Sequence, residues 1–219
     1  MGWAGKLAHP LTMAYTITNG YATLEEVKAE AAIESIDGTD DDVLARCIED
    51  ASRAVDVYTG RQFFAASAAR YFDTPLDGDR RVYLGGDWLT VSAITNGDGS
   101  SVAASLVDLL PINAVSHDTV RLKNSASVYW STTTGGDYLG AIQISGSTGY
   151  VDRTSTDPRS AVVISNTKRA AIITALAYYR KRMGIGGEAV TVTAAGLVLS
   201  PQGLPRDAVQ LIEGYRVMP

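Results

Sequence analysis

The residue types of a nucleophilic enzyme stand side by side at Ser116, His117 and Asp118. In a serine hydrolase an imidazole takes the proton of a hydroxyl, while a carboxylate orients the imidazole. The fold must bring these groups together in space, whereas three consecutive side chains point in different directions. The other histidine, His9, lies in the N-terminal segment. We therefore predict a surface turn at 116–118 and no enzymatic activity.

Metal ligation is the second chemistry to test. Zinc sites combine clustered cysteines and histidines, but the chain has a single cysteine, Cys47, and two histidines far apart in the sequence. The acidic run Asp40, Asp41 and Asp42 lacks the alternate spacing and the terminal glutamate of a calcium-binding loop. Its charge suits the start of a helix instead. We expect no metal ion, no cofactor and a buried Cys47 that forms no disulfide.

Nucleotide and nucleic-acid binding are the third possibility. The glycines of 184–187 follow a predicted helix, whereas a dinucleotide-binding loop follows a strand, and no Gly-Lys-Ser or Gly-Lys-Thr sequence occurs. Two tyrosines followed by three basic residues stand at 178–182, a mixture that can bind single-stranded nucleic acid by stacking and phosphate contact. Packed tyrosines at a basic helix end explain it more simply, although a weak DNA contact or an ion pair between subunits would also fit. The net charge of −5 disfavours a dedicated nucleic-acid binder.

Helical periodicity predicts four helices. A capping box at Thr23 and Glu26 starts the first, which we expect to end at Gly38. The second follows Asp40–Asp42 and ends at Gly60, and its apolar stripe is Leu44, Ile48, Ala51, Val55 and Tyr58. The third is expected from 166 or 167 to 183, and Leu204-Pro205 opens the last.

A β-rich block separates the second and third predicted helices. It is rich in valine, threonine, serine, tyrosine and glycine, with turn signals at 96–99, 135–137 and 146–149. The strands that we expect are 82–84, 89–95, 102–110, 120–122, 128–130 and 141–145, with 102–110 returning beside 89–95. Many short strands with glycine-rich turns favour a small sandwich or barrel.

The sequence thus predicts an α+β fold: a small bundle of about four helices with an inserted β-rich, sandwich-like or barrel-like module and extended arms. We expect an N-terminal arm at 1–20, a helical core at 21–66 and 160–219 that includes a C-terminal arm, and the β-rich module at 67–159. The segments 1–20 and 184–204 are low in charge and punctuated by glycine, as arms that order on assembly would be. No stretch approaches the apolar length of a membrane span, so we expect no membrane partner.

Two segments suggest binding surfaces. The C-terminal residues offer an aromatic, an arginine and a methionine, which are types enriched at interfaces: Tyr215, Arg216, Val217, Met218 and Pro219. In the β-rich block, Trp88, Trp130 and Tyr138 suggest a carbohydrate-binding or host-binding module, although aromatics in such a block more often form its core.

Four stretches resemble the phage head-tail connector (adaptor) family. They are Tyr-Ala-Thr-Leu-Glu-Glu-Val-Lys at 21–28, Asp-Asp-Val-Leu at 41–44, the helix end Val-Tyr-Thr-Gly-Arg-Gln-Phe at 57–63, and Leu-Pro-Arg-Asp-Ala-Val at 204–209 running on to Gly-Tyr-Arg at 214–216. They lie in the helical parts, under half of the chain. The residues of the family motif are Tyr58, Gly60 and Arg61. The β-rich block is larger than the insertion of the shortest members, so its role is left open among an outer decoration and a contact with portal, tail or capsid.

The resemblance implies a structural subunit of the virion, made in the host cytoplasm. Such subunits form a ring, typically dodecameric, below the portal protein; the ring extends the DNA channel and joins the head to the next neck or tail protein. The family offers no catalytic residues. Double-stranded DNA would pass without sequence-specific binding, and the C-terminal residues 215–219 would dock on the portal. Stopper and tail-completion proteins are the nearest alternatives, but they are more uniformly β.

Overall fold

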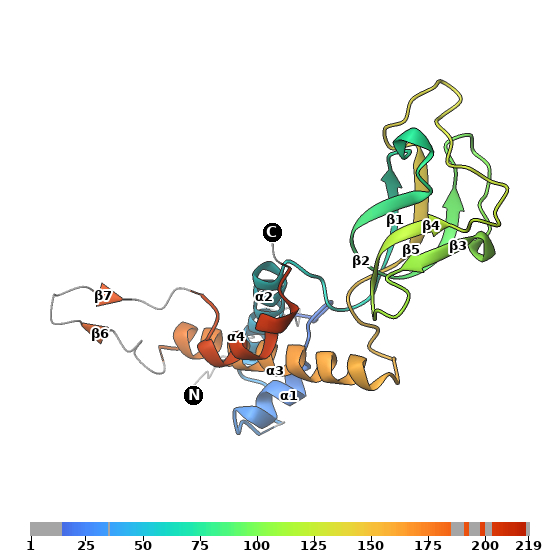
Figure 1. Cartoon of the computed structure of the whole chain (residues 1–219). Helices are drawn as coiled ribbons and strands as arrows, with labels where there is room; N and C mark the ends of the chain where they lie inside the picture. The colour runs from blue at the N-terminus through green and yellow to red at the C-terminus, as the bar shows by residue number, and fades with distance from the viewer. Residues whose placement is uncertain (1–14, 35, 185–190, 193–197, 200–202, 218–219) are drawn as a thin grey trace, which may run out of the picture.

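The computed structural model describes residues 15–34, 36–184, 191–192, 198–199 and 203–217. Its helices gather at one end of the molecule and its five-stranded sheet at the other (Figure 1). In chain order the elements are α1 (Leu24–Glu30), α2 (Asp41–Thr59), β1 (Ala66–Phe72), β2 (Arg81–Thr95), β3 (Val107–Leu110), β4 (His117–Leu122), β5 (Ile142–Thr148), α3 (Pro158–Arg182), β6 (Thr191–Val192), β7 (Val198–Leu199) and α4 (Arg206–Ile212). The predicted α+β fold class is confirmed.

Helix α1 begins as predicted but ends early. The Thr23 hydroxyl accepts a hydrogen bond from Glu26 N, and the Glu26 carboxylate accepts one from Thr23 N, which completes the capping box. The helix ends at Glu30 rather than at Gly38, because Ala32 adopts a positive φ of 55° that a helix cannot contain. Lys168 of α3 binds the same Glu26 at 2.6 Å, so the cap also ties α1 to α3.

Helix α2 agrees with the prediction at both ends. It runs from Asp41 to Thr59, and Gly60 closes it in the left-handed conformation with a φ of 68°. The residues of its apolar stripe are buried except for the half-buried Tyr58. The stripe packs against α3, where Ile48 and Ala51 meet Ile172 and Ala175. This contact is the centre of the helical unit.

Helix α3 starts well before the predicted 166 or 167. Asp157 caps it by accepting a hydrogen bond from Arg159 N at 2.8 Å, and Pro158 occupies its first turn. The early turns show no apolar stripe because their buried positions include the small polar residues Ser160 and Thr167. None of the helices that the structure describes is both long enough and apolar enough to cross a membrane.

The β-rich block forms one antiparallel sheet with the strand order β1-β5-β2-β4-β3. Strand β2 joins the predicted strands 82–84 and 89–95 into one, and its register shifts where it passes from β4 to β5. The sheet bends there, so both halves of β2 enclose a common core around the fully buried Trp88. The predicted barrel-like character therefore comes from a single bent sheet.

One predicted strand, 102–110, starts later and has a different partner, one is absent, and one observed strand was not predicted. Residues 102–110 leave β2 after the single bridge between Thr95 and Ser101, and β3 pairs with β4 instead. Residues 128–130 form no strand, although Trp130 packs on the sheet core. Strand β1 was not predicted, because Ala-Ser-Ala-Ala-Arg-Tyr-Phe shows no clear alternation of apolar and polar residues.

The predicted arms are only partly described. Residues 15–20 lie along α2, where Tyr15 N donates to Asp42 at 2.8 Å and Asn19 N donates to Glu49 at 3.0 Å. Within 184–204, the short strands β6 and β7 pair as an antiparallel ribbon. Residues 1–14 lie outside the described part of the chain.

The closest backbone approach in the sheet gives a test of its packing. A Cβ added at Gly146 of β5 would lie 2.1 Å from the carbonyl oxygen of Thr90 in β2. We expect Gly146→Ala to lower the free energy of unfolding by about 1–3 kcal/mol, because the strands must separate. Denaturant unfolding measures this. Gly135→Ala is the control, because its added Cβ would have no neighbour nearer than 3.7 Å; an equal loss in both variants would contradict the strand packing described.

Candidate functional site

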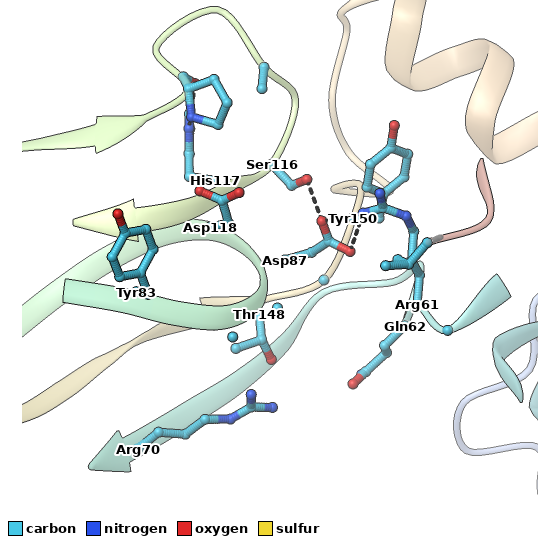
Figure 2. Close-up of a pocket in the computed structure, with 17 residues that line it drawn as sticks. Arg61, Gln62, Arg70, Tyr83, Asp87, Ser116, His117, Asp118, Thr148 and Tyr150 are labelled. Carbon is cyan, nitrogen blue, oxygen red and sulfur yellow. Dashed lines mark hydrogen bonds and ion pairs between the residues drawn. The ribbon is translucent and has the colours of Figure 1, made fainter. Parts of the chain in front are cut away.

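The end of α2 joins the helices, the sheet and the C-terminal tail through Arg61. Its Nη1 binds both carboxylate oxygens of Asp87 in β2, at 2.5 and 2.7 Å. Its Nε donates to the carbonyl oxygen of Tyr215 at 2.7 Å. The guanidinium also lies 4.5 Å from the ring centre of Tyr150, which follows β5. One side chain therefore fixes three segments that are distant in the sequence, and Figure 2 shows two of its partners, Asp87 and Tyr150.

The C-terminal tail continues along the same helix end. Val217 N donates to the carbonyl oxygen of Thr59 at 2.8 Å. Arg216 lies over the ring of Tyr58, 5.4 Å from its centre. The Tyr58 hydroxyl hydrogen-bonds to Glu213, and this bond raises the pKa of the phenol. The predicted motif at the end of α2 and the predicted C-terminal binding residues are thus in direct contact.

Tyr215 belongs to an aromatic cluster beneath this contact. Its ring packs edge-on to Phe63, with 5.9 Å between ring centres, and lies 6.0 Å from Tyr150. Its hydroxyl accepts a hydrogen bond from Asn166 of α3 at 3.0 Å. Of the five C-terminal residues, Tyr215 is half-buried, Arg216 and Val217 are exposed, and residues 218–219 lie outside the described part of the chain.

Tyr21 closes the cluster from the N-terminal side. Its buried hydroxyl donates to Asp56 and accepts from Phe63 N at 3.0 Å. Burial raises the pKa of Tyr21 and also that of Asp56, so the phenol stays protonated. Stretches 21–28, 57–63 and 214–216, which carried the family resemblance, therefore meet around Phe63.

A cavity of about 710 Å³ separates the helix end from the sheet, and it contains the residues first considered for catalysis. The Ser116 hydroxyl donates to Asp87 at 2.8 Å, whereas His117 Nδ1 faces the carbonyl oxygen of Pro111 at 2.9 Å. Asp118 accepts from the hydroxyl of its neighbour Thr119. Figure 2 shows the Ser116 hydroxyl directed at Asp87 and away from His117. The serine and the histidine are therefore not arranged as a nucleophile and its base.

The other chemical candidates have structural partners. Asp41 pairs with the buried Lys28, Asp42 holds Tyr15 N, and Asp40 accepts from the Tyr179 hydroxyl at 2.7 Å. Cys47 is buried as predicted, and burial raises the pKa of its thiol. Across the described residues, no group of three or more histidine, cysteine, aspartate or glutamate side chains could hold a metal ion.

The aromatic residues that suggested carbohydrate binding are mostly structural. Trp88 is fully buried in the sheet core, and Trp130 Nε1 donates to the carbonyl oxygen of Arg80 at 2.9 Å. Tyr138 is the one of the three that is exposed, at 47%. In the basic aromatic cluster at 178–182, Tyr178 and Tyr179 pack beside the helical core. This is the simpler of the readings considered for it.

Sequence reasoning missed Asp87, which completes the junction. The residue follows two glycines in the middle of a strand, and Arg61 stands 26 positions earlier. The only local signal was a lone carboxylate between the predicted strands 82–84 and 89–95. Tyr150 and Asn166 were missed for the same reason, because their partners come from segments far away in the chain.

Comparison with known proteins places this fold. No model of a protein family matches the chain, and no curated protein matches it. Several solved structures do match. The chain is similar to a protein in the neck of an empty gene transfer agent (GTA) particle, computed with C6 symmetry (16% identity, 94% of both chains, TM-score 0.58). It is also similar to one in the neck of a native GTA particle with C12 symmetry (17% identity, 94% of this chain and 93% of the other, TM-score 0.55).

A third match comes from the virion of a native gene transfer agent particle. Its identity is 18%, its TM-score is 0.56, and the likeness covers 94% of both chains. Because each match spans the helices and the sheet together, the inserted β module is part of the shared fold. The chain therefore has the fold of proteins found in the neck of phage-like particles.

The junction predicts a measurable coupling between Arg61 and Asp87. Arg61→Lys keeps the charge but loses the forked geometry, so we expect it to lower the free energy of unfolding by about 1–3 kcal/mol. A double-mutant cycle with Asp87→Asn should give a coupling of about 1–2 kcal/mol. The exposed pair Arg159 and Asp157 is the control and should show no measurable coupling. Equal coupling energies in the two cycles would contradict the role of the Arg61–Asp87 pair in joining the helices to the sheet.

Proposed function

We propose that this chain is a structural subunit of the neck of a phage-like particle. It forms a ring beneath the portal, extends the DNA channel and joins the head to the tail or to the next neck protein. The observation that carries the proposal is the likeness to neck proteins over 94% of the chain, including the β module. The four helices also agree with an adaptor rather than with a more uniformly β stopper or tail-completion protein.

A ring of identical copies, which we propose to be a dodecamer, is supported by the symmetry of those necks. The similar proteins occur in assemblies with C6 and C12 symmetry. Cyclic rings are built from one repeated contact between two different surfaces of the same chain. The subunit acts by shape and association, without a cofactor or a reacting group, and its place is the virion.

Charge fits a channel that lets DNA pass. The net charge of −5 makes the ring mildly repulsive to phosphate, so double-stranded DNA moves through without sequence-specific contact. The portal is the partner on the head side, and the next neck or tail protein is the partner on the other side. We assign the portal contact to Tyr215, Arg216, Val217, Met218 and Pro219, because Arg216 and Val217 are exposed on a rigid helix end.

Ring formation tests the proposal. Mass photometry of the purified chain, alone and with the portal protein from the same particle, should show many copies of the chain added per portal. Electron microscopy of the mixture should show them as one ring on the channel axis. Particles that lack this chain should also lose their packaged DNA or fail to join tails. Particles that keep their DNA and join tails normally without it would disprove the proposal.

The tail contact has a separate test. A deletion that included Tyr215 would also remove its packing against Phe63. The test therefore uses a variant that changes only the exposed residues, Arg216→Ala combined with Val217→Ser. We expect portal binding to weaken at least about tenfold, as for an interface anchor, with unchanged circular dichroism. Ile36→Ser is a control at an exposed residue outside the tail. Unchanged portal binding in the tail variant would place the contact elsewhere while leaving ring formation intact.

A further inference from the structure

The β module carries, beside β1 and the start of β2, exposed apolar side chains that no contact among the described residues explains. We call them the tyrosine patch: Tyr71, Leu76, Tyr83, Tyr138 and Leu139. Between 47% and 68% of each side chain is exposed to solvent. Contiguous apolar patches on a soluble protein mark binding surfaces, and tyrosine is enriched in them.

The patch is continuous. Tyr71 of β1, Leu76 in the turn that follows and Tyr83 of β2 line one groove of about 520 Å³. The loop before β5 is held beside it, because Thr74 N donates to the carbonyl oxygen of Tyr138 at 2.8 Å and Gly140 N donates to Asp73 at 2.7 Å. Tyr138 and Leu139 therefore lie in a loop beside the groove, whereas strands β1 and β2 present Tyr71 and Tyr83.

The rim of the patch is acidic. Asp73 and Asp79 line the groove, and Asp137 precedes Tyr138. All three carboxylates are exposed, and none forms an ion pair with the described residues. Arg81 is the one basic residue that lines this groove. A partner with positive charge around an apolar contact would complement the patch.

The same chain offers such a surface at its opposite end. The last turn of α3 carries three basic residues and is followed by Met183, which is 41% exposed. Arg180 is exposed and forms no ion pair with any described residue. Arginine and methionine are both enriched at protein interfaces.

The two surfaces cannot meet within one molecule. Helix α3 begins beside the sheet, where Arg159 donates to the carbonyl oxygen of Asn113 at 2.9 Å. Its 25 residues extend about 37 Å away from that point. Figure 1 shows the end of α3 on the far side of the helices from the sheet. Complementary surfaces at opposite ends of a chain produce head-to-tail contacts between copies.

We propose that the tyrosine patch of one copy binds the C-terminal end of α3 of a second copy. This contact would be a lateral contact of the ring, so the inference rests on the proposed function and adds the role of the β module to it. A tyrosine-lined groove with carboxylates could also hold a glycan. We favour a second copy because the complement of the patch, in charge and in apolar character, lies on the chain itself and a closed ring requires two unlike surfaces.

Cross-linking of mixed variants tests the direction of the contact. Tyr83→Cys and Arg180→Cys each add one exposed thiol, while the native Cys47 stays buried. With a short bis-maleimide reagent, under conditions where the wild type assembles alone or on the portal, the mixture should give far more cross-linked dimer than either variant by itself. If either variant by itself gave as much cross-linked dimer as the mixture, the head-to-tail contact would be overturned. If the wild type forms rings but the mixture of variants gives no cross-linked dimer, the head-to-tail contact is overturned too, and the proposed function still stands.

Substitutions test the energetics by mass photometry. Tyr71→Ser with Tyr83→Ser should weaken association at least about tenfold, whereas Ile112→Ser, 67% exposed outside the patch, should not change it. Asp137→Lys and Arg180→Glu should each weaken association by about twofold to fivefold, and combining both should restore it. Normal association of the double tyrosine variant would disprove the inference, and its loss of binding on a glycan array would then assign the groove to carbohydrate. A wild type that never assembles would disprove both proposals.

Discussion

The structure depends on the guanidinium of Arg61. Two short segments, 60–65 and 149–157, connect the helices to the sheet, and backbone links of this kind leave the relative orientation of two units free. Arg61 removes that freedom by binding Asp87 in the sheet and the carbonyl oxygen of Tyr215 in the tail. Taking these charges out of water is costly. The paired carboxylate oxygens, the carbonyl and the Tyr150 ring offset that cost only while all the segments are in place.

This constraint gives a physical meaning to the short motif at the end of α2. Gly60 ends the helix by adopting a φ of 68°, which turns the chain so that Arg61 faces the sheet. Tyr58, half a turn earlier, supports Arg216 from the other side. The spacing of the three residues thus follows from the need to stop a helix and hold two segments at its end. In the proposed ring this rigidity would be needed, because a small error in orientation repeated in every copy prevents closure.

The parts that could be predicted from the sequence are those governed by neighbours in the chain. The capping box at Thr23 and the apolar face of α2 are local signals, and both are correct. The start of α3 was misplaced because its early buried positions are small and polar. Strand partners and the junction were missed for a different reason: β3 pairs with a strand that comes later, and Asp87 acquires its partner only when the chain folds.

The junction also explains why the tail and the β module are mechanically linked. Val217 N donates to the carbonyl oxygen of Thr59, the last residue of α2. Arg61, two residues further along the chain, binds Asp87 of β2. A partner that docks on Arg216 and Val217 therefore meets a surface whose position is set by Asp87, across the cavity in Figure 2. Proteins transmit such constraints through packed, hydrogen-bonded chains of contacts. The tail and the tyrosine patch are thus presented by one rigid frame, so portal binding and lateral association would act on the same geometry.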